Sequence, residues 1–309
     1  MKKLFATIVV ALSAFVSVSA QDTTAVQPIP SPWTTGLITQ VGFSQVSLTN
    51  WAAGGFGSLA LNSYINATAD YAKDALMWNS QLQLGFGFLQ TFGEGLKKTD
   101  DRIVLDSKFG YKAVDKLYFS AVFNFTSQFS TGYKGVVKES DKVSNFFAPA
   151  YTSLGLGIDY TPNQYISLNF APLTGKVTMV KDAELRTKYG NAENEFARWE
   201  LGAQLKVNAK VQVKDFSAET MLTLFSNYLD KPQNIKVNWD VAITAKLTRF
   251  LSASLRTNLI YDDKVRFLEK KDKSGNVIVD ESGKPILYPA VQFKELFSLN
   301  FQYTLTNKK

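Results

Sequence analysis

Apolar residues recur at every second position over long stretches of this chain. Between residues 235 and 247 the odd positions are all apolar, whereas the even positions include Lys236, Asp240 and Lys246. A period of two places the apolar side chains on one face of a strand, while a helix would scatter them around its axis. The same alternation returns at residues 117–126, 198–211 and 293–306. The chain is therefore predicted to form long β-strands with one apolar face.

Segments of this kind predict twelve strands, and their connections alternate in length. The strands are expected at residues 34–44, 57–72, 76–91, 101–113, 117–131, 151–161, 164–173, 197–213, 216–228, 234–247, 250–262 and 290–306. Tight connections, at 73–74, 114–116, 162–163, 214–215 and 248–249, take turns with longer ones, the longest being 174–196 and 263–289. Short turns at one end, long loops at the other and an even strand number are typical of an outer-membrane barrel.

The fold class predicted is all-β, a transmembrane up-and-down antiparallel β-barrel of about 12 strands. In lipid every backbone polar group must be paired, so the sheet has to close on itself. A soluble exported sandwich or jelly roll is the alternative, with its core on the apolar face. That alternative would leave rows of large aromatic side chains facing water.

The first residues resemble a secretory signal peptide. Lys2 and Lys3 precede an apolar run from residue 4 to 16, and small residues at 18–20 precede Gln21. The run is short for a transmembrane anchor, and no later apolar segment reaches the length of a membrane helix. We expect a cleaved signal peptide at 1–20, a short periplasmic N-terminal segment at 21–33 and the outer-membrane β-barrel at 34–309.

The composition argues against an enzyme. The chain has 309 residues with 0 His and 0 Cys, so it lacks the usual base for activating serine or water. Adjacent acids such as Asp100 and Asp101 point to opposite faces of a strand, so we expect no catalytic residue. The segment 272–276 fits a hairpin turn better than a calcium loop, and we expect no metal site and no cofactor. The net charge of +7 is spread along the chain, which does not favour nucleic acid as a partner.

The inward face is where a function is expected to show. If the apolar face meets lipid, the inward positions carry more basic than acidic side chains, the acids being Asp70, Asp106, Glu200 and Asp240. The candidate lumen-lining basic residues are Lys108, Lys206, Lys210, Lys236, Lys246 and Arg256. A net positive lumen would favour small anionic solutes in a narrow passive channel. Alternatively, these charges pair across strands and fill the interior.

The first long connection is a candidate plug for the barrel mouth. It reads SLTNWAAGG at residues 47–55 and is poorly suited to water. Trp51 is expected to fold back over the mouth, with Gly54 and Gly55 supplying the turn. The alternative is that Trp51 belongs to an aromatic girdle at the lipid interface.

Several long blocks resemble an uncharacterised family of outer-membrane barrel proteins, a domain of unknown function found in Bacteroidota. The blocks are FSQVSLTNWAAGG (43–55), KTDDRIVLDSKFGYKA (98–113), FFAPAYTSLGLGIDYTPN (146–163), FAPLTGKVTMV (170–180) and LFSNYLDKPQNIKVNW (224–239). The resemblance implies a protein of the cell outer membrane in a Gram-negative envelope, with no assigned activity.

Two functions of different classes follow from the sequence. The first is the narrow, porin-like channel for anionic solutes, in contact only with outer-membrane lipid. The alternative is a non-conducting barrel that acts as a scaffold or surface-binding subunit of an envelope complex, with other envelope proteins as partners.

Overall fold

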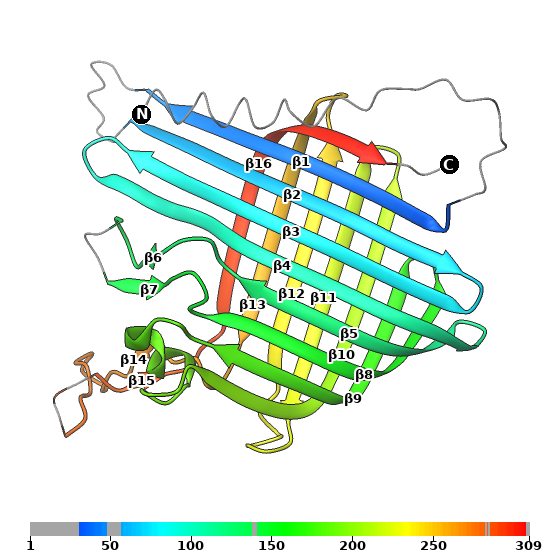
Figure 1. Ribbon diagram of the computed structural model, residues 1–309. Coiled ribbons are helices and arrows are strands. Elements are labelled where there is room, and N and C mark those ends of the chain that lie inside the picture. The colour runs from blue at the N-terminus through cyan, green and yellow to red at the C-terminus, as the bar shows by residue number, and fades with distance from the viewer. Residues whose placement is uncertain (1–30, 48–56, 138–140, 282, 284, 307–309) are drawn as a thin grey trace. The chain divides into compact units, whose positions relative to one another are not determined.

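Twelve antiparallel strands close into a barrel, as the sequence predicts (Figure 1). The computed structural model describes residues 31–47, 57–137, 141–281, 283 and 285–306. The barrel belongs to the compact unit Pro32–Lys309, and the unit Met1–Ser31 lies outside the described residues except for Ser31. The order around the barrel is β1-β16-β13-β12-β11-β10-β9-β8-β5-β4-β3-β2. The strands are β1 (Trp33–Val46), β2 (Ser58–Lys73), β3 (Leu76–Thr91), β4 (Gly95–Val114), β5 (Leu117–Ser127), β8 (Ala150–Asn163), β9 (Ile166–Met179), β10 (Ala197–Val213), β11 (Phe216–Asn227), β12 (Lys236–Lys246), β13 (Leu251–Tyr261) and β16 (Gln292–Thr306).

The two ends of the barrel differ in their connections. Tight turns join β2 to β3, β4 to β5, β8 to β9, β10 to β11 and β12 to β13, all at one end. β1 begins and β16 ends there too, since Trp33 pairs with Tyr71 and Gly36 pairs with Thr306. By the usual orientation of such barrels this is the periplasmic end, and the opposite end, with the long loops, is external.

The two faces of the sheet differ as the alternation predicts. On β16 the outward side chains Phe293, Phe297 and Phe301 are 62%, 66% and 68% exposed, whereas the inward Asn300 is 3% exposed. At the periplasmic end the ring centroids of Trp33 and Tyr71 lie 5.1 Å apart. Aromatic clusters of this kind mark a membrane interface. An apolar outer surface around a polar interior identifies the fold as a transmembrane barrel. No helix within the described segments has the length and apolar character of a membrane span.

Two strands extend six residues beyond their predicted bounds, since β4 begins at Gly95 instead of residue 101 and β9 ends at Met179 instead of residue 173. β9 continues past residue 173 to Met179, because a bulge around Pro172 shifts its register against both β8 and β10. Proline has no N–H to give to a ladder, so a bulge accommodates it. Gly157 faces this bulge, and a Cβ there would lie 2.0 Å from the carbonyl oxygen of Phe170. Glycine at 157 therefore permits the close approach of β8 to β9.

Small ordered elements cover part of the external end. Strands β6 (Gly132–Tyr133) and β7 (Lys142–Ser144) pair within the β5–β8 loop, and the 3-10 helices η1 (Ala183–Leu185) and η2 (Thr187–Tyr189) lie in the β9–β10 loop. Strands β14 (Leu268–Glu269) and β15 (Leu287–Tyr288) pair within the β13–β16 loop. In that loop the hairpin turn predicted at 272–276 forms, with Lys271 and Val277 paired on either side of it, and a second bridge joins Val279 to Pro285.

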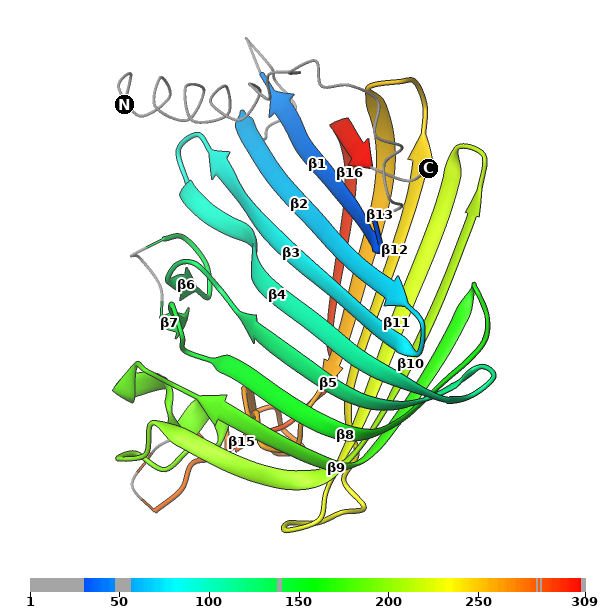
Figure 2. The ribbon, with the colours of Figure 1, turned by 45° about the vertical axis from the view of Figure 1, so that its right-hand side comes forward.

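The barrel closes between its first and last strands, and this seam is its shortest ladder among the described residues. It runs from the pair Gly36–Thr306 to the pair Gly42–Asn300. The β2–β3 ladder, by contrast, runs from Ser58–Thr91 to Lys73–Leu76. Towards the external end β1 and β16 diverge (Figure 2).

Candidate functional site

The six candidate basic residues take two kinds of position. Lys108, Lys206, Lys236 and Arg256 lie on the inward face within the barrel, and each contacts a partner there. Lys210 and Lys246 lie on the same face but at the periplasmic rim, where both are exposed. The inward cations therefore do not form one continuous positive lining.

A buried cluster of charges occupies the external part of the lumen. Nζ of Lys236 lies 2.6 Å from Glu200 Oε1 and 3.1 Å from Asp262 Oδ2. Arg198 Nη1 lies 2.9 Å from the other oxygen of Glu200. The side chains of Lys236, Glu200 and Asp262 are 6%, 1% and 8% exposed. Charges buried this deeply are stable only when paired, so each holds the others in place.

Further ion pairs cross the lumen below this cluster. Lys206 on β10 bonds to Asp106 on β4, although three strands of the barrel separate β10 from β4. Nearer the periplasmic end, Nζ of Lys108 lies 2.8 Å from Oδ2 of Asp159. These contacts fasten walls that the backbone ladder does not join directly.

A chain of four charges spans the middle of the lumen. Lys294 on β16 bonds to Asp100, whose Oδ2 lies 4.0 Å from Arg102 Nε. Arg102 Nη1 in turn lies 3.7 Å from Oδ1 of Asp240 on β12. β4 and β12 stand opposite each other in the strand order, so this last pair spans the barrel. Asn258 adds a hydrogen bond of 2.9 Å to Asp240.

Arg256 lies beside this chain of charges. Its guanidinium carbon lies 3.4 Å from the centroid of the Tyr64 ring, and its Nη2 donates to Oε1 of Gln40. A cavity bounded by Tyr64, Arg102, Asp240 and Arg256 has a volume of only about 40 Å³. That space holds a few water molecules and no larger solute.

Several charged residues of this network are absent from the candidates chosen by sequence. Arg102 and Asp159 lie inside the predicted strands and share their inward parity, and Asp100 lies one residue before the predicted start at 101, so the same alternation would have found all three. Arg198 likewise shares the inward parity of β10 with Glu200, whereas Lys176 was out of reach, since it lies beyond the Pro172 bulge, where the parity of β9 changes.

The external loops form a second cluster. Nζ of Lys142 lies 2.7 Å from Oδ2 of Asp182 and 2.7 Å from Oε2 of Glu184. The hydroxyl of Tyr189 donates to the carbonyl of Val143 at 2.7 Å. The hydrogen bond from Lys142 holds the pKa of Asp182 below its ordinary value, and burial raises the pKa of Tyr189 to about 12. The β5–β8 and β9–β10 loops are thus fastened together.

Two other expectations concern a plug and a metal. The plug residues Trp51, Gly54 and Gly55 lie outside the described residues. Within the described part of the chain, no three His, Cys, Asp or Glu side chains gather closely enough to hold a metal ion. Asp272 instead accepts hydrogen bonds from the backbone N–H groups of Ser274 and Asn276, at 2.8 Å and 2.9 Å, which is the geometry of a turn.

Comparison with solved structures finds other barrels. An outer membrane channel from Pseudomonas putida F1 is 14% identical, with 93% of this chain and 100% of that chain covered and a TM-score of 0.38. The translocator domain of the autotransporter NalP from Neisseria meningitidis is 10% identical, with 98% and 95% covered and a TM-score of 0.34. No curated protein matches this chain.

Residues 43–133, from within β1 to the end of β6, match the model of a family described as a protein of unknown function (DUF3078). Two of the five blocks that suggested a resemblance, 43–55 and 98–113, lie inside this match. The expected resemblance to an uncharacterised family is therefore confirmed over residues 43–133.

Proposed function

We propose that this chain is a non-conducting barrel of the outer membrane that holds an ordered binding surface at its external end. The observation that carries the proposal is the chain of charges from Lys294 to Asp240, which joins opposite walls at the middle of the lumen. No catalytic role is proposed.

The crossing charges favour a closed lumen over an open one. A solute passing this depth has to separate Arg102 from Asp240 and find room beside the Arg256 side chain. Separating partly buried partners leaves charges without compensation where water is scarce, which is costly. The cavity beside Arg102, Asp240 and Arg256, about 40 Å³, is too small for a solute to pass between these side chains.

The external loops form an ordered surface that a closed barrel can present to a partner. They are held by their own contacts, among them the Lys142 ion pairs and a small apolar core of Ala148, Val180 and Leu185. An ordered loop surface on a rigid scaffold is the usual location of binding residues. We therefore favour a surface-binding or scaffold subunit of an envelope complex, with lipid and other envelope proteins as its partners.

The narrow channel for anionic solutes is the second candidate. It is favoured by the inward lysines at the periplasmic rim, where Lys210 and Lys246 are exposed. The anion preference stays a prediction, and conduction would require the crossing pairs to part.

A planar-bilayer experiment separates the two functions. We expect the unaltered protein to be electrically silent, and the double variant Arg102→Ser with Asp240→Ser to pass small currents because it removes the crossing pair. Lys210→Ser, at the exposed rim, is the matched control and should stay silent. A stable anion-selective current from the unaltered protein would replace the closed barrel with the channel.

A deletion distinguishes a filled lumen from a plugged one. Removing residues 51–55 takes away the candidate plug and leaves the crossing charges in place. We expect this variant to remain silent, provided that it still shifts in a heat-modifiability gel as a folded barrel does. Currents from the deletion variant alone would instead assign the closure to the first external loop.

A further inference from the structure

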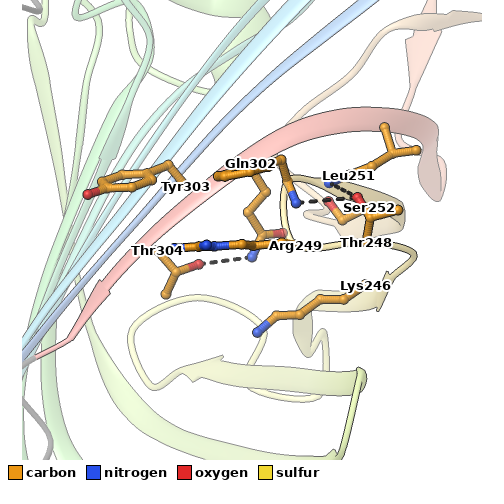
Figure 3. Close-up of a pocket in the computed structure, with 9 residues that line it drawn as sticks. Lys246, Thr248, Arg249, Leu251, Ser252, Gln302, Tyr303 and Thr304 are labelled. Atoms are coloured by element: carbon orange, nitrogen blue, oxygen red, sulfur yellow. Dashed lines mark hydrogen bonds between the residues drawn. The ribbon is translucent and has the colours of Figure 1, made fainter.

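A notch in the periplasmic rim forms a pocket that is separate from the lumen charges (Figure 3). β13 begins at Leu251, which pairs with Phe301, whereas β16 continues to Thr306. The β12–β13 turn therefore leaves the last residues of β16 uncovered on one edge. The cavity has a volume of about 280 Å³ and is lined by Lys246, Thr248, Arg249, Phe250, Leu251, Ser252, Gln302, Tyr303 and Thr304.

The charged groups of this pocket are all positive. Lys246 and Arg249 line it, and no acidic residue does. Among the described residues neither of the two has a carboxylate within ion-pair distance, in contrast to the lysines deeper in the barrel. The guanidinium carbon of Arg249 lies 5.3 Å from the centroid of the Phe250 ring, a contact that favours one orientation of a long side chain.

The hydroxyl groups of the pocket are arranged to donate. Thr248 Oγ1 accepts from the N–H groups of Phe250 and Leu251, at 3.4 Å and 3.1 Å. Thr304 Oγ1 accepts from Nε2 of Gln302 at 3.1 Å. Because these oxygens already accept hydrogen bonds, their O–H groups remain to donate.

Ser252 belongs to the wall of the pocket. Its side chain is fully buried against the pocket, at 0% exposure, and its Oγ has no hydrogen-bond partner among the described residues. With no accessible surface, this oxygen does not face the cavity, so the groups that a ligand can contact are Lys246, Arg249 and the threonine hydroxyls.

We propose that this pocket binds a phosphate group, carried by a phospholipid headgroup or present as a free anion. A phosphate offers several acceptor oxygens to the two cations and the two threonine hydroxyls, and arginine is well suited to hold it. The volume of about 280 Å³ fits a headgroup and not a large ligand. Tyr303 and Phe250, 57% and 55% exposed at the same rim, lie where an aromatic belt meets lipid headgroups. This site is independent of whether the lumen conducts.

Binding to the purified full chain in a nonionic detergent tests the proposal. Calorimetric titration at low salt would use two probes, inorganic phosphate and a short-chain phosphatidylglycerol. We expect the double variant Lys246→Gln with Arg249→Gln to bind at least about tenfold more weakly, since two charge-assisted contacts are lost. Lys210→Gln, an exposed lysine of the same rim outside the pocket, should bind within about twofold of the unaltered protein.

The outcomes separate the sources of the phosphate. Tighter binding of the lipid than of inorganic phosphate identifies a headgroup site, and equal binding identifies a site for the free anion. Absence of binding for both probes at millimolar concentration overturns the proposal, as does equal weakening by Lys210→Gln. If the double variant fails to fold, the single variant Arg249→Gln, in the exposed turn, takes its place under the same criteria.

Discussion

The two ends of strand β12 carry lysines of the same parity in opposite surroundings. Lys236, at the external end, is 6% exposed and contacts Glu200 and Asp262. Lys246, at the periplasmic end, is exposed and faces the notch, whose lining has no acidic residue. Strand β10 repeats the contrast, with Lys206 paired inside and Lys210 exposed at the rim. Parity therefore selects the face of a strand, while depth along the strand decides whether a charge is fixed or available.

The largest difference is expected between substitutions at the two ends of β12. Lys236→Gln leaves Glu200 and Asp262 buried with less compensation, so it should lower the free energy of unfolding by about 3–5 kcal/mol. Lys246→Gln removes an exposed charge and should change it by no more than about 0.5 kcal/mol. Urea unfolding of the barrel refolded in lipid vesicles measures both. Equal losses of unfolding free energy would mean that the contribution of a lysine to stability does not depend on its depth along the strand.

A smaller difference is expected between the two faces of the same strand. Val241→Lys places a charge towards the hydrocarbon and should cost about 2–4 kcal/mol. Thr244→Lys adds a lysine to the inward face two positions from Lys246, near the wet rim, and should be tolerated. Heat-modifiability gels and the same unfolding assay compare them, and equal tolerance of both would contradict the assignment of the faces.

The smallest effect concerns the external loops. The pKa of Asp182 is lowered from 3.8, mainly by its hydrogen bond with Lys142. Because the pKa of Asp182 is lower in the folded protein than in the unfolded chain, its ionised carboxylate stabilises the folded loops above pH 3.8. This stabilisation is lost as the pH falls through the pKa that Asp182 has in the folded protein. Hydrogen exchange, corrected for intrinsic rates, should show loop 141–149 losing protection between pH 6 and pH 3 while β16 keeps it.

The variant Asp182→Asn serves as the control for this pH effect. It should show the looser loop at both pH values, because its amide does not titrate. An unaltered protein whose loop is equally protected at pH 6 and pH 3 would show that the Lys142–Asp182 pair does not hold the loops together.

The strands could be predicted from sequence because lipid imposes a strict alternation on them. The segment 216–228 has apolar residues of both parities around Met221, yet β11 forms there because its neighbours on either side require a strand. The continuation of β9 to Met179 could not be predicted, since the bulge at Pro172 breaks the period that the prediction relies on.

Less of the candidate site than of the fold could be predicted from the sequence. Alternation identifies Lys206 and Asp106 as inward residues but does not say that they meet, because three other strands separate theirs around the barrel. That contact depends on the number of strands and their stagger, which together set the distance across the lumen. The notch at Arg249 likewise depends on where β13 begins relative to β16.

The short seam between β1 and β16 bears on how the barrel is assembled. All other ladders of the barrel join strands that follow each other along the chain, whereas this one joins its two ends. Bringing distant segments together costs more chain entropy than closing a tight turn, and topologies with such contacts fold slowly. We therefore expect the hairpins to form first and the seam last. The ladder of the seam covers only Gly36–Gly42 of β1, so few backbone hydrogen bonds offset the entropy lost on closure. We therefore also expect the barrel to open first at this seam.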